Sequence, residues 1–198
     1  MINAPDYHIA TNAAYELLIE QDILELPVNL SKLIYLRRQN THLMTYSQMA
    51  ARFSMTISDY KDLAPSELGF TMKMGNRNYI LYNEEKGYCT NRFTIAHEIG
   101  HIMLGHKTDN SVAEREANCF ARNLLCPVPV INGFNITKID DYMGWFHVSD
   151  LMAENSIKNI SSDRYYIKDH LYSIVDNLIY TYMTGESLAS AYGYSYYN

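Results

Sequence analysis

The sequence predicts an α+β fold that is mostly helical and contains a small β-sheet. Three observations lead to this prediction: several segments have apolar residues at helical spacing, two short β-like runs flank a group of turn residues, and the composition is that of a globular protein. Of the 198 residues, 47% are hydrophobic and 19% are charged, which is sufficient for one domain with a sizeable core.

Two helices are predicted near the N-terminus. Apolar residues recur with helical spacing from Ala10 to Gln21, and a second helix is expected from Leu30 to Arg37, after Pro27 restarts the chain. The stretch that follows, as far as Leu63, is mixed in character and predicts no definite element.

Two β-like runs follow in the segment ELGFTMKMGNRNYILYNEE. The runs Gly69–Met74 and Asn78–Asn83 are separated by turn residues, which predicts a β-hairpin. The alternation of the second run allows one buried face. We interpret this run either as a plain core strand or as an edge strand that pairs with an extended substrate.

Two further helices are predicted in the centre of the chain, at Asn91–Gly105 and at Val112–Cys126, and the second ends at the sequence CPVP. Beyond Pro129 the pattern weakens. We therefore expect a main domain over residues 1–130 and a helical region over residues 131–198. The latter contains an amphipathic helix at Tyr165–Met183 and a loose tail at Thr184–Asn198.

The first central helix carries the motif HEIGH. His97 and His101 are four residues apart, so both imidazoles lie on one face of the helix and can bind the same metal ion. Glu98 is rotated by about 100° from His97, which makes it a poor ligand but lets it reach a water bound to that ion. This is the HExxH arrangement of zinc metallopeptidases, in which zinc lowers the pKa of a water and the glutamate accepts its proton.

A catalytic zinc site needs a third protein ligand, and the second central helix offers Glu114 and Glu116. The buried stripe of this helix centres on Ala117, and Glu114 lies about 60° from that centre whereas Glu116 lies about 100° from it. Asn118 lies one turn beyond Glu114 and could form a hydrogen bond to a ligand histidine. Glu114 is therefore the preferred ligand, with Glu116 as the alternative or with both residues forming only a solvated acidic first turn.

His106 is rejected as the third ligand. The motif HExxHxxGxxH would require glycine at position 104 and histidine at position 107, where this chain has Leu104 and Lys107. We interpret His106 as a histidine at the C-terminal end of the helix, where it complements the helix dipole.

The segments RFTIAHEIGHIMLGH and EREANCFARNLLCP together resemble the ImmA/IrrE family of zinc metallopeptidases, strongly from about residue 78 to residue 127 and loosely elsewhere. The resemblance implies a zincin-like metallopeptidase domain with a helical C-terminal extension, and Zn²⁺ as the cofactor. The family pattern E-x-x-A-[ND]-x-F-A matches Glu114, Ala117, Asn118, Phe120 and Ala121. The resemblance thus also implies Glu114 as the ligand, with an Asn rather than an Asp at position 118.

Members of this family are cytoplasmic, and several occur in phages and mobile elements, where they cleave or inactivate a helix-turn-helix repressor. The resemblance therefore implies a repressor as the partner of this chain. A net charge of −6 makes a broad nucleic-acid-binding face unlikely and suits a basic protein partner. The chain has no apolar run of membrane-spanning length, no recognisable signal peptide, and only three cysteines, of which Cys119 and Cys126 are expected to be buried thiols.

Two functional hypotheses follow. In the first, the chain is a zinc metallopeptidase in which His97, His101 and Glu114 bind Zn²⁺ and Glu98 is the general base. In the second, the chain is a zinc-containing binding module that inactivates a repressor without cutting it. Glu98 favours the enzyme, because a purely structural zinc site does not require it.

Overall fold

The computed structural model describes residues 4–20, 25–108 and 110–185. Helices dominate, and the strands of the described residues form one small sheet, which confirms the predicted α+β class. The elements are α1 Tyr7–Glu20, the 3-10 helix η1 Leu30–Lys32, α2 Ile34–Arg38, β1 Thr41–Thr45, α3 Tyr46–Arg52, α4 Ile57–Leu63, β2 Gly69–Met74, β3 Arg77–Tyr82, α5 Tyr88–Met103, α6 Ser111–Leu125, α7 Val128–Gly133, α8 Ile139–Phe146, α9 Asp150–Tyr166 and α10 Asp169–Thr184.

The sheet has the order β1-β3-β2, with β1 parallel and β2 antiparallel to β3. The predicted hairpin is confirmed, because Phe70 is paired with Leu81 and Met74 with Arg77. The interpretation of the second run as an edge strand is wrong. β3 lies in the centre of the sheet, with Tyr79 and Leu81 buried on one face and Ile80 on the other.

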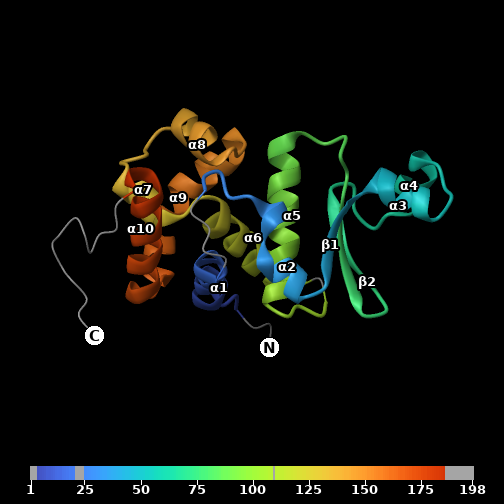
Figure 1. Cartoon of the computed structure of the whole chain (residues 1–198), viewed down its shortest axis with the longest axis horizontal. Helices are drawn as coiled ribbons and strands as arrows, with labels where there is room; N and C mark the ends of the chain where they lie inside the picture. The colour runs from blue at the N-terminus through green and yellow to red at the C-terminus, as the bar shows by residue number, and fades with distance from the viewer. Residues whose placement is uncertain (1–3, 21–24, 109, 186–198) are drawn as a thin grey trace.

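Two hydrophobic clusters lie on opposite faces of this sheet. α3 and α4 cover one face, where Tyr46, Met49 and Tyr60 surround Leu81. α5 covers the other face, followed by α6 and α1, as Figure 1 shows. The larger cluster extends from Leu17 in α1 to Val175 in α10, so residues on both sides of position 130 share one core.

The segment predicted as one helix at Leu30–Arg37 is instead broken at Leu33, which has extended ψ (119°) and separates η1 from α2. The break lets Leu30, Leu33 and Leu36 all enter the core. The mixed stretch that followed contains β1, α3 and α4. A capping box marks the start of α3: the Thr45 side chain accepts from the Gln48 backbone N–H, and the Gln48 side chain accepts from the Thr45 N–H.

The C-terminal helix begins at Asp169 and not at Tyr165, because the helical conformation is interrupted between α9 and α10. The buried Asn12 of α1 forms hydrogen bonds to backbone groups at this interruption between the two helices. Its Nδ2 donates to the carbonyl of Tyr166 and its Oδ1 accepts from the N–H of Lys168. A residue distant in sequence thus pairs the backbone groups that are left without a helical partner where α9 ends and α10 begins. Residues 186–198 of the expected loose tail lie outside the described residues.

Among the residues that the structure describes, no helix combines the length and the apolar character needed to cross a membrane.

Candidate metal centre

The two central helices of the site pack closely at Gly100. A Cβ atom at this position would lie 2.9 Å from Cδ1 of Phe120 and 3.3 Å from Cα of Ala117. Any residue larger than glycine would push α6 away from α5, because real Cβ atoms do not approach a neighbour so closely. Gly100, inside the HEIGH motif, therefore sets the distance between the helices that carry the candidate ligands.

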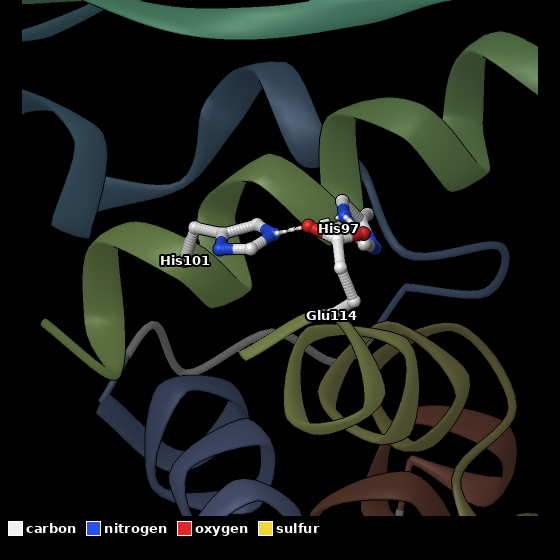
Figure 2. A group of neighbouring side chains, drawn as sticks. All are labelled: His97, His101 and Glu114. Atoms are coloured by element: carbon white, nitrogen blue, oxygen red, sulfur yellow. Dashed lines mark hydrogen bonds and ion pairs between the residues drawn. The ribbon is translucent and has the colours of Figure 1, made fainter. Parts of the chain in front are cut away.

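The side chains of His97, His101 and Glu114 converge from these helices, as Figure 2 shows. Their candidate ligand atoms all lie within 4.8 Å of one another. The two Nε2 atoms are 2.9 Å apart, and the Glu114 oxygens are 3.4 Å from Nε2 of His97 and 3.3 Å from Nε2 of His101. The carboxylate thus faces both imidazoles.

Both candidate ligand histidines are mostly buried, whereas Glu114 is partly open to solvent: 14% of the His97 side chain, 11% of the His101 side chain and 46% of the Glu114 side chain are exposed. Nδ1 of His97 lies 2.9 Å from Oδ1 of Asn118, the residue expected from the sequence to contact a ligand histidine. An amide oxygen can only accept a hydrogen bond, so Nδ1 of His97 donates in this contact, and in the neutral ring Nε2 then has the lone pair.

Glu98 lies beside this cluster and is 9% exposed. The Thr71 hydroxyl on β2 donates to Oε2 of Glu98, with 2.8 Å between the oxygens. This contact holds the carboxylate at the boundary between α5 and the sheet. Sequence spacing did not indicate Thr71, because its proximity depends on how the hairpin packs against α5.

A cleft of about 750 Å³ opens over these residues. Phe70 and Thr71 of β2 line one side, and the four residues His97, Glu98, His101 and Glu114 lie in its wall. The cleft is therefore bordered by β2, an edge strand of the sheet, and Asn78 of β3 also lines it.

Glu116, the alternative ligand, lies away from the metal cluster. Its Oε2 is 2.9 Å from Nε2 of His106, and its Oε1 accepts from the N–H of Asp6. His106 was expected to serve the helix dipole. His106 does lie just beyond the end of α5, and its side chain also joins Glu116 to His101, a contact that spacing alone did not indicate.

Cys119 and Cys126 are buried, as expected. Burial raises the pKa of the Cys126 thiol to about 12 and also raises the pKa of the Cys119 thiol. Both residues are therefore held as neutral thiols and not as thiolate ligands.

The family comparison bears directly on this site, because residues 50–142 match the model of the IrrE N-terminal-like domain, Peptidase_M78. This segment is therefore similar to the IrrE N-terminal-like domain. It includes α5, α6 and β2 and thus every residue of the cluster and cleft described above. The match agrees with the ImmA/IrrE resemblance of the two central motifs and assigns the segment to a family of peptidases. No curated protein and no solved structure matches the chain.

Proposed function

We propose that this chain is a zinc-dependent peptidase that hydrolyses a peptide bond in a regulatory protein of the cytoplasm. One observation carries the proposal: a buried glutamate, Glu98, shares a cleft with a cluster of two histidines and one carboxylate. A structural zinc site uses four protein ligands and is closed, whereas a catalytic site uses three and stays open.

The donor set fits Zn²⁺. Two nitrogen ligands about 2.0–2.1 Å from a tetrahedral zinc lie about 3.3 Å apart. In the cluster the two Nε2 atoms are 2.9 Å apart, Oε2 of Glu114 lies 3.4 Å from Nε2 of His97, and Oε1 of Glu114 lies 3.3 Å from Nε2 of His101. Two imidazoles and a carboxylate are a ligand combination that zinc peptidases use.

When bound, Zn²⁺ supplies Lewis acidity, which lowers the pKa of a coordinated water and polarises the carbonyl of the scissile bond. Glu98 then accepts the proton of the attacking water and passes it to the leaving amine nitrogen as the carbon–nitrogen bond breaks. The hydrogen bond from Thr71 to Oε2 of Glu98 holds this carboxylate beside the histidine cluster.

The substrate segment is proposed to be extended. β2 is paired with β3 on one side only within the described residues, and Phe70 and Thr71 of this strand line the cleft. An extended peptide could add to such an edge through backbone hydrogen bonds and present its carbonyl to the metal centre. A helix or an internal strand cannot, since its backbone groups are already paired.

The partner is proposed to be a helix-turn-helix repressor of a phage or mobile element, cut in a linker outside its folded domains. This part of the proposal rests on the resemblance to the ImmA/IrrE family. The net charge of −6 supports it, because an acidic chain associates faster with a basic DNA-binding protein.

The substitution Glu98→Gln tests this function. We expect Glu98→Gln to bind one zinc per chain like the original protein, because Glu98 is not a proposed ligand. We also expect it to lose cleavage by roughly 10²- to 10⁴-fold, the usual contribution of a general base. The measurement is co-expression with a helix-turn-helix repressor encoded beside this chain, followed by fragment mapping by mass spectrometry.

Cleavage at a linker that disappears with Glu98→Gln supports the peptidase. A Glu98→Gln protein that still relieves repression while the repressor stays intact would favour the non-cleaving binding module. An intact repressor together with cleavage of another protein would rule out this partner.

A further inference from the structure

A series of side-chain contacts extends from His101 away from the candidate metal centre. Nδ1 of His101 lies 3.0 Å from Nδ1 of His106, and Nε2 of His106 lies 2.9 Å from Oε2 of Glu116. The other oxygen of Glu116 accepts from the backbone N–H of Asp6 at 2.6 Å. The residue before α1, the end of α5 and the first half of α6 thus meet behind one candidate ligand.

The end of α5 positions His106 for this contact. Gly105 has φ +67°, the left-handed conformation that glycine adopts without strain. The N–H of Gly105 donates to the carbonyl of Ile102, and the N–H of His106 donates to the carbonyl of His101. This is a Schellman motif, and it turns the chain back so that the His106 ring meets the His101 ring edge to face, with 4.9 Å between centroids.

The two side chains that complete this series of contacts are well shielded from solvent: 11% of the His106 side chain and 17% of the Glu116 side chain are exposed. An ion pair between solvent-exposed side chains contributes little to stability, whereas a hydrogen bond to a shielded carboxylate is short and strong. The contact between His106 and Glu116 is therefore a specific connection and not an incidental surface pair.

The donors and acceptors in this series of contacts suit a His101 ring whose Nε2 lone pair binds a metal ion. The Glu116 carboxylate can only accept, so Nε2 of His106 donates to it, and in the neutral ring Nδ1 of His106 is then an acceptor. Nδ1 of His101 must then donate, which leaves Nε2 of His101 as the lone pair directed to the cluster. Asn118 imposes the same arrangement on His97 by a different partner.

We propose that His106 and Glu116 form a positioning pair that orients the His101 imidazole and thereby strengthens zinc binding. The inference rests on the proposed zinc site, but it does not depend on which peptide is cut. Glu116 and His106 act through His101 and do not touch the metal. Outer partners of this kind typically contribute about 10- to 100-fold in metal affinity.

The experiment measures the dissociation constant for Zn²⁺ by competition with a chromogenic chelator, using the metal-free full chain. The variants are His106→Gln, Glu116→Gln and the double variant. His170→Gln and Glu154→Gln are matched controls, because both residues are exposed and lie on α10 and α9. Circular dichroism melting of each metal-free protein measures folding separately, and the Co²⁺ absorption spectrum measures ligand geometry.

We expect each single variant to bind Zn²⁺ about 10- to 100-fold more weakly than the original protein, with an altered Co²⁺ spectrum. The double variant should be no weaker than the weaker single variant, because both residues act along one path. Both controls should bind normally.

Normal affinity in both single variants overturns the inference, even if their melting temperatures fall. Complete loss of zinc in His106→Gln with normal binding in Glu116→Gln also overturns it, since His106 would then be a ligand. An original protein that binds no zinc, in contrast, refutes the proposed function itself.

Discussion

Glu114 is the most exposed of the three candidate ligands. Its side chain is 46% exposed, yet one oxygen lies close to each imidazole. It is in the first turn of α6, whose N-cap Asn110 accepts from the backbone N–H groups of Val112 and Ala113. This cap orients the first turn, so the carboxylate reaches the metal centre from a rigid helix end.

We predict that Glu114→Ala removes zinc from the purified protein. Loss of one of three ligands should weaken binding by more than the roughly 100-fold upper limit for an outer partner. Metal analysis after dialysis checks this. Arg115→Ala, a neighbouring exposed position, is the control and should retain one zinc per chain. Retention of zinc by Glu114→Ala would show that α6 supplies no ligand.

At the scale of elements, the site depends on how closely α5 and α6 approach. Phe120 is fully buried, and a Cβ atom on Gly100 would lie 2.9 Å from its ring. The backbone of Ala117 lies close on the same side. Neither neighbour can rotate into solvent, so relief of the overlap requires a shift of the helices that carry the ligands.

We predict that Gly100→Ala destabilises the fold by about 1–2 kcal/mol, because overpacking outweighs the better helix propensity of alanine. Zinc affinity should fall with it, since His101 is the adjacent residue. Urea denaturation and chelator competition measure the two effects. Gly144→Ala is the matched control: a Cβ atom on this α8 glycine meets nothing within 4 Å, so stability should rise slightly.

At the scale of the whole molecule, an ion pair connects α6 to α9. Nε and one terminal nitrogen of Arg122 donate to the two oxygens of Asp163, at 2.6 and 2.7 Å. The side chains are 13% and 3% exposed. Burial lowers the pKa of Arg122, but the hydrogen bonds and the charge of Asp163 raise this pKa by more, so Arg122 keeps its positive charge in the folded protein.

We predict that Asp163→Ala costs about 3–5 kcal/mol of folding free energy, because it leaves the Arg122 charge shielded from water without its partner. Thermal melting measures the loss. Asp169→Ala removes the exposed pair with Arg164, in which Asp169 is 89% exposed, and should cost roughly 1 kcal/mol or less. Equal losses in the two variants would mean that the buried pair does not hold α9 against α6.

The sequence by itself determined the features that depend on local periodicity. The helical spacing of HEIGH brings His97 and His101 onto one face of α5, and the phase of the buried stripe of α6 directs Glu114 to the same side. The alternation on both sides of GNRN was sufficient for the hairpin. Each feature arises from residues within a single helix or a single hairpin, where the backbone geometry determines their relative positions.

Only the tertiary structure decided the features that need a distant partner. β1 pairs in parallel with β3 although α3, α4 and β2 lie between them in sequence, so β3 is central and β2 is the edge strand that borders the cleft. Asn12 accepts a hydrogen bond from the backbone N–H of Lys168 where the helix is interrupted before Asp169. Asp6 and Glu116 complete the contacts behind His101. These partners lie on other elements, and no period within one segment encodes which distant group will satisfy a given donor or acceptor.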